Sequence, residues 1–153
     1  ALCFDSYVYG KLIRFPNNEA IFGKQQIYNE QDQVCGTEPN LLINATEISF
    51  DGLWELVRSY GGVMFPAHVD KTANSLIANL GFIPPDSRFR TAEVKDLKKL
   101  HQLQKDNPYL DKCRIISNSD AHYLEHMNEP ELTLQVEEKT VQGIIDALLD
   151  GAG

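Results

Sequence analysis

Two short segments of the sequence carry residue types that bind metal ions, and each follows a short, mostly apolar run. The segment 117–122 reads Ser-Asn-Ser-Asp-Ala-His after the run 114–116, and the segment 65–70 reads Phe-Pro-Ala-His-Val-Asp at the end of the run 62–65. Each run has the length and composition of a buried parallel strand. Because parallel strands present binding and catalytic groups at their carboxyl ends, we predict that the two segments converge.

The spacing of Asp120 and His122 indicates what this convergence could do. On an extended chain, residues two apart point the same way, so both side chains would face one cleft while Ala121 turns away. A carboxylate with an imidazole suits Zn, Mn or Fe, whereas Ca or Mg favours oxygen ligands alone. Asp120 and His122 are therefore candidate metal ligands, and His68 lies in the other segment that is expected to converge on them. The alternative is that Asp120 caps the following turn and His122 is a partly exposed polar residue.

Five further polar side chains are weighed for a role near this site: Lys71, Arg90, Glu93, His101 and His126. His126 is a candidate for contact with a metal or its ligands, and the two cations are candidates for contact with a phosphate. Glu93, at a strand end, points into the site or accepts backbone hydrogen bonds. For His126 and the two cations the alternative is a solvated surface residue, and His101 is interpreted as one.

Composition limits the class of protein. A chain of 153 residues with 42% hydrophobic content is expected to form a single domain over 1–153 with a real core. The net charge of -8 argues against a nucleic-acid backbone or an anionic membrane as a partner. An anionic substrate stays open, because bound metal ions invert the local field of a cleft. The sequence shows no signal peptide and no apolar run long enough to span a bilayer.

The cysteines and the first residues suggest where the chain comes from. Cys3, Cys35 and Cys113 are odd in number and lack the spacing of a metal or redox motif, which predicts free thiols in the cytoplasm. The sequence lacks an initiator Met and opens in the apolar stretch 1–4. We interpret it as a piece of a longer protein.

Apolar periodicity and cap residues predict the helices and strands that position these side chains. Helices are predicted over 2–15, 49–60, 72–80, 96–104 and 140–149. Strands are predicted over 63–67, 90–94, 114–116 and 132–136, and the segment 41–43 is left as a strand or a helix start. Residues 25–37 are predicted to form a hairpin excursion on the surface, or else a disordered polar loop. The alternation of strands and helices predicts an α/β fold with a parallel sheet, open or curled into a barrel.

These motifs resemble a known family. The segment 66–70, followed by 117–122, resembles the third and fourth motifs of the PHP (polymerase and histidinol phosphatase) family of metal-dependent phosphoesterases. The intervening segments 74–76 and 81–87 resemble a bacterial branch of that family, and the resemblance extends from about residue 41 onward. It implies a distorted seven-stranded β/α barrel that holds up to three divalent metal ions at the carboxyl ends of its strands.

The resemblance also implies roles for the site residues. His68, Asp120 and His122 would each ligate a different metal ion, and these ions would hold a small-molecule phosphoester and activate a water. Family members begin with a His-x-His, followed by an Asp-His motif, a glutamate and a further histidine, and the sequence shows no match to these. The chain is therefore expected to be the carboxyl-terminal part of such a barrel.

An incomplete site has two consequences. A stable catalytic site usually needs at least three protein ligands on one ion, so the chain alone is predicted not to be a competent phosphoesterase. Open strand edges predict a homo-oligomer. Two other functions remain open, a non-catalytic interaction module that uses the hairpin at 25–37 and an amidohydrolase-like hydrolase that cleaves C–N bonds.

Overall fold

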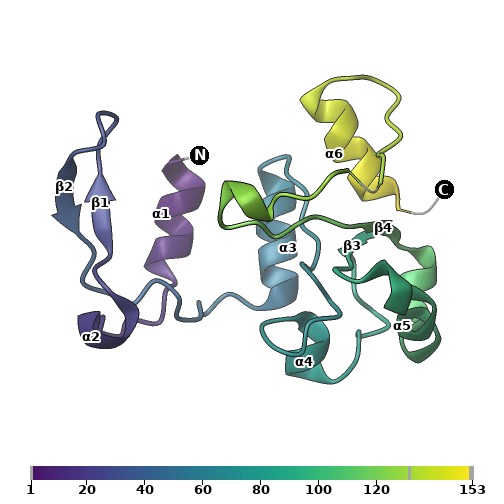
Figure 1. Cartoon of the computed structure of the whole chain (residues 1–153), viewed down its shortest axis with the longest axis horizontal. Coiled ribbons are helices and arrows are strands. Elements are labelled where there is room, and N and C mark those ends of the chain that lie inside the picture. Colours follow the sequence, from purple (N-terminus) through teal and green to yellow (C-terminus); the bar gives the residue numbers. More distant parts are fainter. Residues whose placement is uncertain (1, 131, 152–153) are drawn as a thin grey trace. The chain divides into compact units, whose positions relative to one another are not determined.

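The computed structural model describes residues 2–130 and 132–151. The chain divides into two compact units, Ala1–Gly52 and Leu53–Gly153, whose elements are drawn in Figure 1. Helix α3 (Phe50–Ser59) crosses the boundary between them. Among the described residues, we find no helix with the length and apolar character that crossing a membrane requires.

The first unit contains two short helices and a hairpin: α1 (Leu2–Gly10), α2 (Glu19–Phe22), β1 (Gln26–Tyr28) and β2 (Val34–Thr37). The two strands pair antiparallel, so the hairpin predicted within 25–37 is present. Asn29 shapes its loop, because its side-chain Oδ1 accepts hydrogen bonds from the backbone N–H of Gln31 at 3.0 Å and of Gln33 at 2.9 Å.

Polar contacts hold much of this first unit together. The Gln25 side chain donates to the carbonyl oxygens of Glu38 at 3.1 Å and Asn40 at 2.6 Å. Among the described residues of the unit, the buried hydrophobic side chains are Leu12 and Leu41, each 9% exposed. The first unit therefore has little apolar core.

Among the described residues, the second unit contains most of α3 and eight further elements. They are α4 (Leu76–Leu80), β3 (Thr91–Glu93), η1 (Leu97–Lys99), α5 (Leu100–Asp106), η2 (Pro108–Lys112), β4 (Arg114–Ile116), η3 (Leu124–His126) and α6 (Val141–Asp150). Side-chain caps fix two helix starts, because Ser75 Oγ accepts from Ala78 N and Thr140 Oγ1 accepts from Gly143 N, both at 3.0 Å.

Among the described residues of the second unit, one apolar cluster forms the core. Its buried members are Val69, Ile83, Phe89, Ala92, Val94, Tyr109, Leu110 and Cys113. The rings of Phe89 and Tyr109 lie 4.9 Å apart, and the Tyr109 hydroxyl donates to the Phe89 carbonyl oxygen at 2.8 Å. Asn107 Oδ1 accepts from the Ile83 N–H at 3.0 Å, which pairs a buried donor.

Three chain segments meet along β3. On one side β3 pairs parallel with β4, so that Glu93 lies opposite Ile116. On the other side the Glu93 N–H donates to the Pro66 carbonyl oxygen at 3.0 Å, and the Val69 N–H donates to the Glu93 carbonyl oxygen at 2.9 Å. The segment 66–69 and strand β4 therefore lie on opposite sides of β3. The residues that follow each of them, including Asp70 and Asp120, come after the carboxyl end of this arrangement.

The predicted partial barrel is wrong. The described residues form two sheets of two strands each, of which only β3 and β4 pair in parallel, and no barrel closes. Residues 63–67 form no strand, because Pro66 has no N–H to add to a ladder and the chain turns at His68, where φ is +31°. Residues 132–136 also form no strand, and their side chains are mostly exposed.

The predicted helices agree with the structure to different degrees. Those expected over 49–60 and 140–149 are confirmed as α3 and α6. The helix expected from residue 2 ends at Gly10, five residues before the predicted end at residue 15, and the helix expected from residue 72 begins at Leu76. The helix expected over 96–104 is present as η1 followed by α5.

Candidate functional site

His68 and Asp120 lie at sharp turns that follow the segments beside β3. The backbone φ is +31° at His68 and +53° at Asp120, both in the left-handed region that few residues other than glycine adopt. Asp and His enter this region more readily than bulky or β-branched residues do. Strained backbone of this kind is common at functional sites, so these turns mark the edge as a candidate site.

Positively charged groups surround the carboxylate of Asp120. The Lys71 ammonium forms an ion pair with Asp120 Oδ2, and the Asp120 side chain is 27% exposed. This hydrogen bond, together with the charges of Lys71, His68 and Lys95, lowers the pKa of the Asp120 carboxyl. The ion pair between Lys71 and Asp120 therefore joins the two segments, and Lys71 lies three residues after His68.

His122 takes a different direction. The turn at Asp120 ends the extended geometry that would have placed the two side chains side by side, and His122 Nδ1 lies 3.0 Å from the backbone carbonyl oxygen of Asp120. The imidazole is exposed and borders an open cavity of about 500 Å³ together with Tyr123 and Leu124.

Two other carboxylates at this edge organise the backbone. Glu93 is 7% exposed, and its Oε2 accepts a hydrogen bond from the His68 N–H at 3.3 Å. This contact agrees with the interpretation that Glu93 accepts backbone hydrogen bonds. Asp70 accepts from the N–H groups of Lys95 at 2.7 Å and Asp96 at 2.9 Å. Burial raises the pKa of Asp70, but these backbone hydrogen bonds outweigh burial and bring the pKa below its usual value.

The donors at this edge match a divalent metal in kind but not in number. An imidazole and a carboxylate suit Zn, Mn or Fe. Within residues 2–130 and 132–151, however, no three His, Cys, Asp or Glu side chains are grouped closely enough to hold a metal ion. The described part of the chain therefore offers an incomplete ligand set.

A small polar cavity lies beside the edge. Its volume is about 270 Å³, and its lining residues are Lys95, Ser117, Asn118, Ser119, His126 and Asn128. The Lys95 ammonium donates to the carbonyl oxygen of Ser119. Reasoning from the sequence missed Lys95, which lies two residues after the end of β3, and its place beyond a strand end was the available signal.

The remaining candidates lie away from this cavity. Arg90 is exposed and borders a different cavity of about 400 Å³ that Trp54 and Leu149 also line. His101 is exposed on α5, which agrees with its interpretation as a solvated residue.

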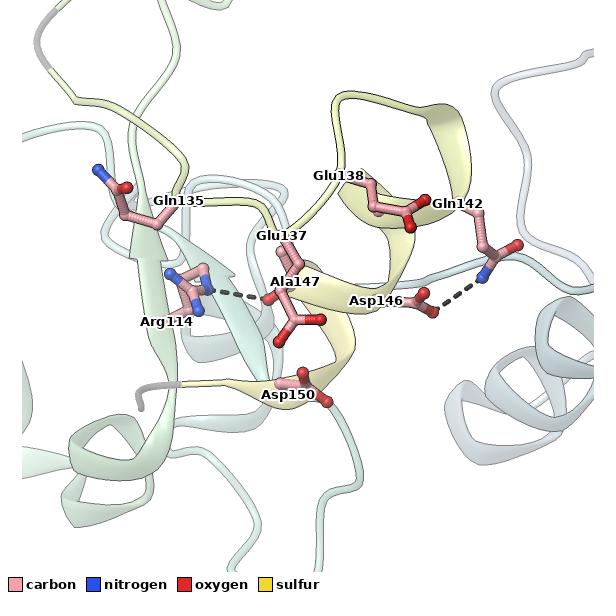
Figure 2. Close-up of a pocket in the computed structure, with 9 residues that line it drawn as sticks. Arg114, Gln135, Glu137, Glu138, Gln142, Asp146, Ala147 and Asp150 are labelled. Carbon is pink, nitrogen blue, oxygen red and sulfur yellow. Dashed lines mark hydrogen bonds between the residues drawn. The ribbon is translucent and has the colours of Figure 1, made fainter.

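A larger polar cavity of about 410 Å³ lies along α6 (Figure 2). Four carboxylates and one guanidinium line it, those of Glu137, Glu138, Asp146, Asp150 and Arg114. Two of these groups are already engaged, because Arg114 donates to the Ala147 carbonyl oxygen at 2.9 Å and Asp146 accepts from Gln142 at 2.8 Å. This cavity contains none of the residues predicted to bind metal.

Comparison with models of protein families, with curated proteins and with solved structures yields no match for this chain. The resemblance to PHP phosphoesterases therefore rests on the two motifs and the segments between them. The structural evidence for a function is the arrangement of His68, Lys71 and Asp120 at the edge of β3 and β4.

Proposed function

We propose that the chain contributes part of a metal-dependent phosphoesterase, with His68, Asp120 and His122 as ligands of divalent Zn, Mn or Fe. The missing ligands would come from residues beyond those described. One observation supports this proposal above others: the Lys71–Asp120 ion pair joins the segment that carries His68 to the segment that carries Asp120 at the carboxyl edge of β3 and β4.

The cations at this edge favour a phosphoester over an uncharged substrate. Lys71 pairs with Asp120, and Lys95 reaches the backbone at Ser119 from the next strand end. Ammonium groups bind phosphate oxygens through charge-assisted hydrogen bonds. Carboxylates lie at the same edge, but two ammonium groups at the ends of neighbouring segments could contact an anionic substrate.

Binding of Mn²⁺ to the chain, measured by isothermal titration calorimetry, tests the ligand assignment. We expect weak binding that becomes weaker still in His68→Gln and in Asp120→Asn, since each removes one donor. The matched control is His101→Gln, which changes an exposed histidine on α5 and should leave the affinity unchanged. Equal Mn²⁺ affinity in all four proteins would overturn the assignment.

Lys71 provides a second test of the same site. A metal ion on Asp120 is repelled by the Lys71 ammonium, which already occupies Oδ2. Lys71→Met should therefore tighten Mn²⁺ binding by about fivefold, the factor that corresponds to 1 kcal/mol. Lys98→Met removes the same charge from an exposed position and serves as the control.

Hydrolysis assays decide between the two enzymatic possibilities. A phosphoester and a matched amide are offered in the presence of Mn²⁺ or Zn²⁺. Because the ligand set is incomplete, the chain alone is expected to turn over neither substrate at a substantial rate. Robust phosphoester turnover by the chain alone would contradict this expectation, and amide cleavage without phosphoester cleavage would support the amidohydrolase-like alternative.

One observation favours the non-catalytic alternative, in which the hairpin binds a partner or a second copy of the chain. Ile27, Tyr28 and Val34 on β1 and β2 are 47%, 55% and 52% exposed. Exposed apolar side chains on a short sheet are typical of contact surfaces. Light scattering at low concentration tests self-association, and a clean monomer would count against the proposed homo-oligomer.

A further inference from the structure

The small cavity next to Asp120 differs from its surroundings in charge. The chain has 22 acidic and 14 basic residues, yet the six residues that line this cavity include no carboxylate. They contribute one ammonium, one imidazole, two serine hydroxyls and two asparagine amides. Each of these groups donates hydrogen bonds, so the lining is suited to a ligand that carries several acceptor oxygens.

Two of the lining side chains are held in place. The Lys95 ammonium donates to the Ser119 carbonyl oxygen, which uses one of its three N–H donors and leaves two for a ligand. The His126 ring meets the Tyr123 ring edge-on, with centroids 5.3 Å apart and an interplanar angle of 87°. These contacts reduce the freedom that the two side chains would lose on binding a ligand.

The position of the cavity connects it to the candidate site. Lys95 follows β3, and Ser117 follows β4, so the carboxyl ends of the parallel pair supply two sides of the cavity. Asp120 comes directly after Ser119 in the chain, and the charge of Lys95 contributes to lowering the pKa of Asp120. At about 270 Å³ the cavity is smaller than the pockets that enclose whole drug-sized ligands.

We infer that this cavity binds the phosphoryl group of the ester substrate, with Lys95 and His126 as its principal donors. The inference rests on the proposed function, because it takes the anion to be the phosphoryl group of a substrate. It assigns a role to His126, which the sequence analysis treated as a candidate for contact with a metal or its ligands, or else as a solvated surface residue. Ser117, Ser119 and the two asparagines would supply neutral donors to the remaining oxygens.

The experiment measures binding of inorganic phosphate to the metal-free chain by isothermal titration calorimetry. Lys95→Met and His126→Gln are each expected to weaken binding by about tenfold, because each removes a charge-assisted or directed hydrogen bond. The controls are Lys98→Met and His101→Gln, which make the same chemical changes at exposed positions on η1 and α5. Their affinity should match that of the unmodified chain.

A third variant adds a charge instead of removing one. Asn128→Asp places a carboxylate on an exposed lining residue, and we expect it to abolish phosphate binding by repulsion. Circular dichroism of every variant checks that the fold is retained. Displacement of inorganic phosphate by phenyl phosphate indicates that the cavity accepts a monoester, whereas failure of phenyl phosphate to compete limits the site to free phosphate and overturns the substrate assignment.

The outcomes separate this inference from the proposed function. Phosphate affinity that is unaffected by Lys95→Met and His126→Gln, or no binding by the unmodified chain at millimolar phosphate, would overturn the inference. Because the titration contains no metal, it does not depend on the Mn²⁺ results. Phosphate binding that depends on both residues would support the inference even if His68→Gln and Asp120→Asn left Mn²⁺ affinity unchanged.

Discussion

The two units of the chain bury their side chains differently. The second unit has a continuous apolar cluster of eight buried residues, and it contains every residue of the candidate site. In the first unit, the described residues bury Leu12 and Leu41 and expose Ile27, Tyr28 and Val34. A buried apolar core therefore supports the strand ends where the candidate site lies, whereas the hairpin unit depends more on polar contacts.

The largest expected effect tests that core directly. Leu110 is 0% exposed, and Leu110→Ala should destabilise the second unit by about 3 kcal/mol through lost burial and a residual cavity. Urea denaturation followed by Trp54 fluorescence measures it, since Trp54 is the single tryptophan of the chain and lies in the second unit. Leu41→Ala, followed by hydrogen exchange in the first unit, should cost less; an equal cost would remove the contrast between the units.

Thiol reactivity compares the same two units without changing the sequence. Cys3 and Cys35 are exposed, whereas Cys113 is buried and burial raises its pKa to about 11 from a usual value of 9.0. Since the thiolate is the reactive form, Cys113 should react with a disulfide reagent at pH 8 roughly 100-fold more slowly than the other two. Three equal labelling rates would show that the core of the second unit opens readily.

Helix caps provide a smaller test. Ser75 Oγ is buried, accepts from Ala78 N and donates to the Lys71 carbonyl oxygen at 2.7 Å, so Ser75→Ala should cost about 1 to 2 kcal/mol. Asn18 caps the four-residue helix α2 on an exposed surface, and Asn18→Ala should cost about 0.5 kcal/mol. Thermal unfolding of both variants checks the order, and a larger loss for Asn18→Ala would reverse the comparison.

Acid stability of the site edge provides a further test, in which the size of the effect depends on pH. The pKa of Asp70 is lower in the folded chain than its usual 3.8, so its ionised form stabilises the fold above about pH 4. That contribution is lost as the pH falls below 3.8 through the folded pKa. Asp70→Asn should cost about 1 kcal/mol at pH 7 and flatten the decline below pH 4, as measured by urea denaturation across pH. A decline as steep as that of the unmodified chain would assign the acid sensitivity to other carboxylates.

Local patterns predicted much of the secondary structure. The hairpin at 25–37 and the helices α3 and α6 follow from alternation, 3.6-residue periodicity and cap residues, and the strand at 114–116 is reproduced as β4. These elements depend on neighbours in sequence, which is why short-range patterns suffice.

The pairing of the strands was not predictable in the same way. Residues 63–67 have the composition of a strand, but Pro66 and the turn at His68 limit them to isolated hydrogen bonds with β3. Residues 132–136 have the same apolar character without a partner strand. The composition of a segment determines its tendency to adopt an extended backbone. Whether it pairs as a strand depends on segments that are distant in the sequence.

The residues that could do chemistry at this edge can be recognised from sequence, because the types and spacing of His68, Asp120 and His122 are local properties. Their arrangement in space depends on the fold. Parallel pairing of β3 and β4 places Lys95 near Asp120, and the hydrogen bonds of Pro66 and Val69 to Glu93 hold the segment that carries Lys71. The left-handed turn at Asp120 directs His122 back to its own backbone. Contacts between side chains far apart in sequence depend on how the backbone folds, and no local pattern encodes them.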